Sequence, residues 1–223
     1  MDERMYYMIL EYIPHILLVV ISLPVHEFAH GFIANKLGDD TAYYQGRLSL
    51  NPLRHLDILG TISMILFGYG WAKPVPVNPT RFKCNMRLGM ALTALAGPVS
   101  NLLLALLFTI LYKVALILYT ATAVEFFLFL ASIISSLVFG NIALAFFNLL
   151  PIPPLDGSRI LNYFLPYRAQ AFIDNLERYS FIILAGILML DNRIGFLSNI
   201  LGYLVNFFYF IFDKMTFFLD FLF

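Results

Sequence analysis

Long apolar runs separated by short polar stretches dominate the sequence, and they determine the expected fold. Nearly uncharged runs occupy residues 6–25, 88–118, 126–150, 179–190 and 194–212. A helix needs roughly 20 apolar residues to cross a hydrocarbon core about 30 Å thick. We therefore predict five membrane-spanning helices, the first of which continues through smaller and more polar residues to form one helix over 6–37.

The segment 39–87 is the longest one without a full span. Alternating residues at 47–50 and the prolines after Trp71 predict short edge strands or a β-hairpin. The apolar stretch 58–71 is too short to cross and is expected to re-enter the membrane or to lie at its surface. The predicted fold is an all-α polytopic membrane protein with about five to six transmembrane helices, a re-entrant or β-hairpin segment between the first two, and one domain over 1–223.

Composition supports a membrane protein. The chain is 61% hydrophobic and only 13% charged, whereas an average soluble domain is about 25% charged. The net charge is zero, which gives no indication of a nucleic-acid partner and leaves the lipid bilayer as the expected environment. Cys84 is the only cysteine, so an internal disulfide and a cysteine-based zinc site are excluded. No cleavable signal peptide is evident, and we expect the first helix to be retained.

The basic residues are unevenly distributed. They concentrate in segments 36–87 and 151–178, whereas the turns at 119–125 and 191–195 contain only Arg193. Positively charged connections stay on the cytoplasmic side of a membrane. With five spans, this predicts an external N-terminus and a cytoplasmic C-terminus.

The pentapeptide His26-Glu27-Phe28-Ala29-His30 lies at the end of the first apolar run. Residues i and i+4 share one face of a helix, so His26 and His30 can bind one zinc ion. Glu27 is then placed to take a proton from water without occupying a coordination position. With the His and Glu content of this chain, the expected number of chance occurrences of the H-E-x-x-H pattern is about 0.002. We therefore favour a metal site over two histidines that merely pack.

A catalytic zinc ion needs three protein ligands and one open position. Asp156 is the best third candidate, because it follows the proline-rich stretch 151–154 and lies just beyond the cytoplasmic end of the third span. Its alternative role is an N-cap for a helix starting near Ser158. His55 and Asp57 are the other candidates, although a structural loop network is the more frequent role for such residues.

Four ordered motifs carry a family resemblance. They are the H-E-x-x-H helix, Asn51-Pro52, Ala96-Gly97-Pro98 with Asn101, and the stretch from Asn148 to Gly157. Together they resemble the site-2 protease family of intramembrane zinc metalloproteases, in its compact prokaryotic form. We find no PDZ or CBS domain and no extra helix ahead of the zinc helix.

The resemblance implies one Zn²⁺ per chain, bound by His26, His30 and Asp156. Glu27 would be the general base, and Asn148 would help to hold the substrate or the developing oxyanion. Members of the family cut transmembrane segments of membrane-protein substrates, so we expect a multi-pass protein of a prokaryotic cytoplasmic membrane. The distribution of basic residues places its site toward the cytoplasm. An edge strand from segment 39–87 would receive an unwound substrate by strand addition.

Two other classes of protein remain open from the sequence. A catalytically inactive scaffold of the same fold would bind membrane segments without cutting them. A metal transporter would also place His and Asp among helices, but its ionisable residues are expected at several depths. Here the candidate ligands lie at one depth, which favours the protease.

Overall fold

The computed structural model describes residues 3–67, 70–166, 168–170, 173, 176 and 178–222. Helices dominate the described residues, as predicted, and no β-strand occurs in these ranges. One isolated antiparallel bridge joins Leu56 and Ala72. The predicted β-hairpin is not confirmed. Pro74 and Pro76 lack backbone N–H groups, so a ladder starting at Ala72 cannot continue.

The first membrane helix consists of three stacked pieces. These are α1 (Glu3–Leu17), the π-helical turn η1 (Leu18–Ser22) and α2 (Leu23–Lys36). Pro24 cannot donate a hydrogen bond to the preceding turn, and the wider π-helical turn lies directly ahead of it. The chain leaves α2 through Gly38, whose positive φ of 110° is strained for other residues.

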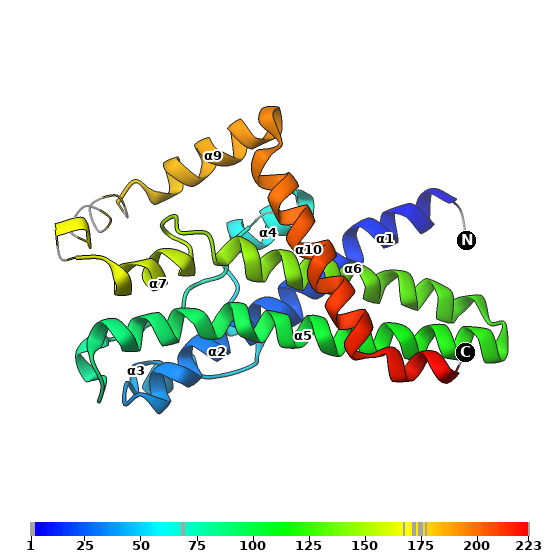
Figure 1. Ribbon diagram of the computed structural model, residues 1–223, viewed down its shortest axis with the longest axis horizontal. Helices are drawn as coiled ribbons and strands as arrows, with labels where there is room; N and C mark the ends of the chain where they lie inside the picture. Colours follow the sequence, from blue (N-terminus) through cyan, green and yellow to red (C-terminus); the bar gives the residue numbers. More distant parts are fainter. Residues whose placement is uncertain are drawn as a thin grey trace.

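Two long helices form the centre of the molecule. α5 (Met86–Thr122) and α6 (Glu125–Asn148) pack as an antiparallel pair, and α2 packs against α5 (Figure 1). The side chain of Asn85 caps α5 by accepting hydrogen bonds from the backbone N–H groups of Arg87 and Leu88. Buried side chains from η1, α5 and α6 form the core between them: Leu18, Val19, Ala105, Leu137, Val138 and Ile142.

Shorter elements connect these helices. They are α3 (Thr41–Tyr44), η2 (Pro52–Arg54), α4 (Ile58–Phe67), η3 (Pro79–Arg81), α7 (Asp156–Phe164) and η4 (Phe217–Leu222). With 10 residues, α4 is too short to cross a membrane, as expected for a re-entrant or interfacial piece.

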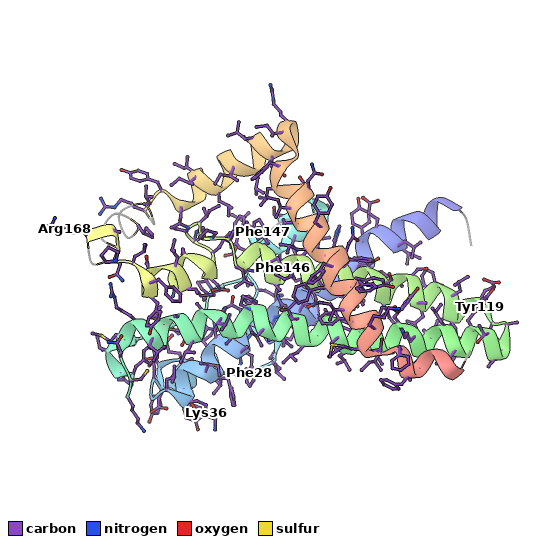
Figure 2. All side chains as sticks on the ribbon, in the orientation of Figure 1. Phe28, Lys36, Tyr119, Phe146, Phe147 and Arg168 are labelled. Atoms are coloured by element: carbon purple, nitrogen blue, oxygen red, sulfur yellow. The ribbon has the colours of Figure 1, made fainter. Side chains whose placement is uncertain are left out.

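The last two helices are α9 (Ser180–Ile194) and α10 (Phe196–Met215). α10 crosses α6, where the rings of Phe146 and Phe208 lie 4.8 Å apart (Figure 2). Nearer its C-terminal end, Asp213 Oδ1 lies 3.0 Å from Lys113 Nζ of α5. The Lys113 side chain is buried and that of Asp213 is 38% exposed, and the ion pair joins α10 to α5.

Four helical stretches in the described part are long and apolar enough to cross a membrane: Ile9–Lys36, Met86–Thr122, Glu125–Asn148 and Phe196–Met215. The predicted fifth span is not confirmed, because α9 has only 15 residues. Both ends of the chain lie at the same end of the molecule as the α5–α6 turn (Figure 1). The expected placement of the two termini on opposite sides therefore finds no support in the fold.

Candidate functional site

Three predicted ligand side chains meet where α2, α5 and α7 come together. His26 Nε2 and His30 Nε2 lie 3.2 Å and 3.3 Å from Asp156 Oδ2, and the two nitrogens are 2.9 Å apart. His26 and His30 are only 5% and 9% exposed. Within the described residues, these three form the one group of His, Cys, Asp and Glu side chains whose ligand atoms converge in this way.

The spacing of these atoms fits a zinc ion. With Zn–N distances of about 2.0–2.1 Å, the ligand atoms of a tetrahedral site are roughly 3.3 Å apart. Two imidazole nitrogens and a carboxylate oxygen facing one another at these distances would be stabilised by a shared cation. Two His ligands and one carboxylate ligand are also a donor set of catalytic zinc sites.

The charge state of Asp156 also suits a metal ligand. Burial of the carboxyl opposes its ionisation, but hydrogen bonds and charge from His26 and His30 outweigh burial and hold the pKa well below its ordinary value. Asp156 is therefore a carboxylate at physiological pH. The ionised state of Asp156 is stabilised by the two neighbouring histidines rather than by contact with solvent.

The start of α7, at Gly157 next to Asp156, lies close against the end of α6. A Cβ atom added to Gly157 would lie 2.1 Å from the carbonyl oxygen of Leu149, so only glycine allows this approach. The N-cap residue of α7 is Leu155, and Asp156 is the first helical residue. The alternative role of Asp156 as an N-cap is therefore wrong.

Backbone groups of α5 hold the imidazoles from the other side. A Cβ atom added to Gly97 would lie 2.5 Å from Cε1 of both His26 and His30. His30 Nδ1 lies 2.7 Å from the carbonyl oxygen of Thr93. Since a carbonyl can only accept, Nδ1 carries a proton and donates it to Thr93, which leaves Nε2 as the ring nitrogen available to a metal ion. The sequence analysis identified residues 96–98 as one of the family motifs, but the sequence could not show that Gly97 faces the imidazoles.

Glu27 is held by a segment from outside the helix bundle. Its Oε2 accepts a hydrogen bond of 2.9 Å from the backbone N–H of Val75. Val75 lies between Pro74 and Pro76, so it supplies the single N–H of this Pro-Val-Pro segment (residues 74–76). Nη2 of Arg47 donates to the carbonyl oxygens of Lys73 and Pro74 at 2.7 Å and 3.2 Å and fixes the segment in place.

This arrangement limits the strand addition expected from the sequence. The N–H of Lys73 donates to the carbonyl of His55, and that of Val75 donates to Glu27. The two prolines have no N–H. Residues 73–76 therefore offer no backbone donor to an added strand in this conformation.

The remaining predicted residues lie apart from the three ligands. Asn148 is the last residue of α6, and its Nδ2 donates to the carbonyl of Leu144 in the same helix at 2.9 Å. Its predicted role toward the substrate or the oxyanion stays a prediction. Buried His55 hydrogen bonds to the carbonyl of Ser49 at 2.6 Å, and Asp57 Oδ1 accepts from the N–H of Gly60 at 2.9 Å. These are the structural loop roles expected for both.

Known proteins resemble this chain over most of its length. The protein named "Putative zinc metalloprotease YwhC" of Bacillus subtilis is 43% identical over 188 residues, covering 82% of this chain and 83% of its own length. Two further relatives are also described as putative zinc metalloproteases. Rip2 of Mycobacterium tuberculosis is 28% identical, covering 84% of this chain and 71% of its own length. MJ0611 of Methanocaldococcus jannaschii is 31% identical, covering 62% of this chain and 63% of its own length. No solved structure matches.

The family model agrees with these relatives. The model described as Peptidase family M50 matches residues 114–190, which include the end of α5, all of α6 and the turn that carries Asp156. The resemblance predicted from the sequence motifs is thus confirmed by two independent comparisons. The chain belongs to peptidase family M50, the site-2 protease family of zinc metalloproteases.

Proposed function

We propose that the protein is an intramembrane metalloprotease whose single zinc ion is bound by His26, His30 and Asp156, with Glu27 as the general base. Its substrates would be membrane proteins cut in or near a transmembrane segment. The observation that supports this proposal is the convergence of three buried ligand atoms within 2.9–3.3 Å at the end of a helix long enough to cross the membrane.

The chemistry follows from the neighbouring groups. When bound there, zinc would supply Lewis acidity, which polarises a peptide carbonyl and lowers the pKa of water toward 7. Glu27 follows His26 directly in α2 and is therefore at the site without belonging to the ligand group. Its carboxylate takes the proton of the attacking water and returns it to the leaving amine, so the base is restored at the end of each cycle.

The Val75 N–H gives Glu27 a fixed orientation. One carboxylate oxygen, Oε2, is occupied by this bond, which leaves Oε1 as the oxygen that accepts the proton. A hydrogen bond to a charged group is shorter and stronger than one between neutral groups. The Pro-Val-Pro segment thus acts as a support for the base.

We propose that the site faces the cytoplasm in a prokaryotic cell membrane. Lys36 and Arg168 lie at the end of the molecule that holds the site, and Tyr119 lies at the opposite end (Figure 2). Basic residues on the site's side support a cytoplasmic orientation. Water and the unwound substrate would then enter from that side, since polar groups persist at membrane depth only where they face protein or water.

Glu27→Gln tests the proposal. The amide is nearly isosteric but cannot take a proton, so cleavage of a membrane-protein substrate should fall by about 10²–10⁴-fold while purified protein keeps its zinc. Glu125→Gln is the matched control, because Glu125 begins α6 at the other end of the bundle and should retain full activity. Wild-type activity in Glu27→Gln, with zinc bound, would remove Glu27 from the mechanism.

A further inference from the structure

The two histidines of the site differ in their second ring nitrogen. His30 Nδ1 donates to the Thr93 carbonyl, whereas His26 Nδ1 is buried and has no hydrogen-bond partner among the residues that the structure describes. A histidine that binds metal almost always donates its other ring N–H to an acceptor, which fixes the ring. His26 is 5% exposed, so bulk water is not available as that acceptor.

Other buried polar groups without partners lie one helical turn from this imidazole. Ser22 Oγ and both side-chain polar atoms of Asn101 make no hydrogen bond within the described chain, and both residues are 0% exposed. Ser22 is four residues before His26, and Asn101 is four residues after Gly97. Residues four apart share one face of a helix, about 6 Å apart along it.

The contacts of α5 with α2 fix the relative level of these groups. Thr93 meets His30 alone, whereas Gly97 abuts Cε1 of both His26 and His30. Moving along α5 from Thr93 to Gly97 therefore moves toward the N-terminal end of α2. Asn101 is one turn beyond Gly97 on the same face of α5, so helix geometry puts it near the level between His26 and Ser22.

A buried polar atom without a partner is unfavourable, and three such residues at neighbouring levels of two packed helices indicate a shared ligand. Buried water molecules typically make about three hydrogen bonds to such groups. We propose that Asn101 positions His26 through one buried water molecule. The water accepts the N–H of His26 Nδ1 and donates to Asn101 Oδ1 and Ser22 Oγ, which makes three bonds and leaves Nε2 available to the metal ion.

This inference rests on the proposed zinc site, so zinc affinity is the natural measurement. Asn101→Leu keeps the approximate size of the side chain but removes both polar atoms. We expect its zinc dissociation constant, measured by competition with a chelator, to rise by about 10–100-fold. Asn101→Asp keeps an acceptor and should hold zinc within a few-fold of the wild type, although a buried carboxylate lowers its thermal stability. If Asn101 only packs the helices, zinc affinity would instead decline with stability in both variants.

Asn141→Leu is the matched control. Asn141 is another fully buried asparagine, but it lies on α6 beside Gly140, which packs against Leu18 about two turns ahead of His26. Its substitution should leave zinc affinity unchanged. Ser22→Ala, a mild change that a helix tolerates, should weaken zinc binding in the same direction as Asn101→Leu but less.

The outcomes separate this inference from the proposed function. If the wild-type protein binds no zinc, the proposed site itself fails. If the wild type binds zinc and Asn101→Leu binds it equally well, only the role of Asn101 is overturned. Equal loss of zinc in Asn101→Asp and Asn101→Leu, or loss in Asn141→Leu, would also overturn it, and unchanged affinity in Ser22→Ala would contradict the shared water.

Discussion

The two candidate aspartates have different surroundings. Oδ2 of Asp156 lies beside the imidazoles of both His26 and His30, whereas Oδ1 of Asp57 accepts a hydrogen bond from the Gly60 N–H and caps a helix. We expect Asp156→Ala to lose most of its zinc and all proteolysis, because two protein ligands remain where a catalytic site needs three. Asp57→Ala should keep its zinc and lose about 1 kcal/mol of stability, the usual effect of removing an N-cap. Metal analysis of the purified proteins measures the difference.

The opposite result would place the site in another loop. Full zinc occupancy in Asp156→Ala, together with zinc loss in Asp57→Ala or His55→Ala, would mean that segment 51–57 supplies the third ligand. The structure argues against this, because the ring of His55 is buried against the carbonyl of Ser49.

Gly97 permits the contact between α5 and the two imidazoles. In Gly97→Ala, the added methyl group would lie 2.5 Å from atoms of both rings, so α5 must shift or the rings must turn. We expect at least a roughly tenfold weaker affinity for zinc, the lower limit seen when support of a ligand is lost. Gly186→Ala in α9 is the control, because nothing lies within 4 Å of the added atom and a helical alanine is more stable than glycine. Equal zinc affinity in both variants would show that α5 adjusts without disturbing the site.

At the scale of elements, the Pro-Val-Pro segment ties the loop region to the base. Val75→Pro removes the backbone N–H that donates a hydrogen bond to Glu27. We expect kcat to fall roughly 10- to 100-fold with zinc retained, because a hydrogen bond to a charged group contributes about 1.5–3 kcal/mol. Val75→Ala keeps the N–H and loses only part of a buried side chain. It should therefore retain a higher kcat than Val75→Pro, and equal kcat values would assign the effect to packing.

The elements that follow from local pattern were predictable. The run 88–118 and the run 126–150 gave helices because their apolar character persists long enough to cross a bilayer. The run 179–190 was also interpreted as a span, but it belongs to a helix of only 15 residues. The alternating residues of 47–50 predicted strands, yet nearby prolines and the hydrogen bonds of Arg47 hold an irregular loop instead.

The part of the site that lies in one local sequence pattern was predictable. His26, Glu27 and His30 lie within one helical turn of each other, so their spacing carried the prediction. Predicting Asp156 as a ligand required only that the first and third spans end on the same side of the membrane. The contacts of Gly97, Thr93 and Val75 join residues far apart in the sequence, and no local pattern indicates which backbone groups will face the site.

At the scale of the whole molecule, the number of spans determines where the C-terminus lies. If the four long helices of the described part all cross, the chain returns to the side on which it began, and both ends lie beside the α5–α6 turn (Figure 1). The Lys113–Asp213 ion pair supports this direction for α10. Lys113 is nine residues from the end of α5, about 13 Å along the helix, so Asp213 is held near the end that carries Thr122.

Cysteine labelling tests this topology in a Cys84→Ser background. Thr80→Cys lies in the basic connection and should react with an impermeant maleimide from the cytoplasmic side. Thr122→Cys and Met215→Cys are both exposed and should react from the external side. A five-span protein would instead expose Met215→Cys to the cytoplasm while leaving the other two unchanged. Reaction of Thr122→Cys from the cytoplasm would invert the whole orientation, and with it the side from which water reaches Glu27.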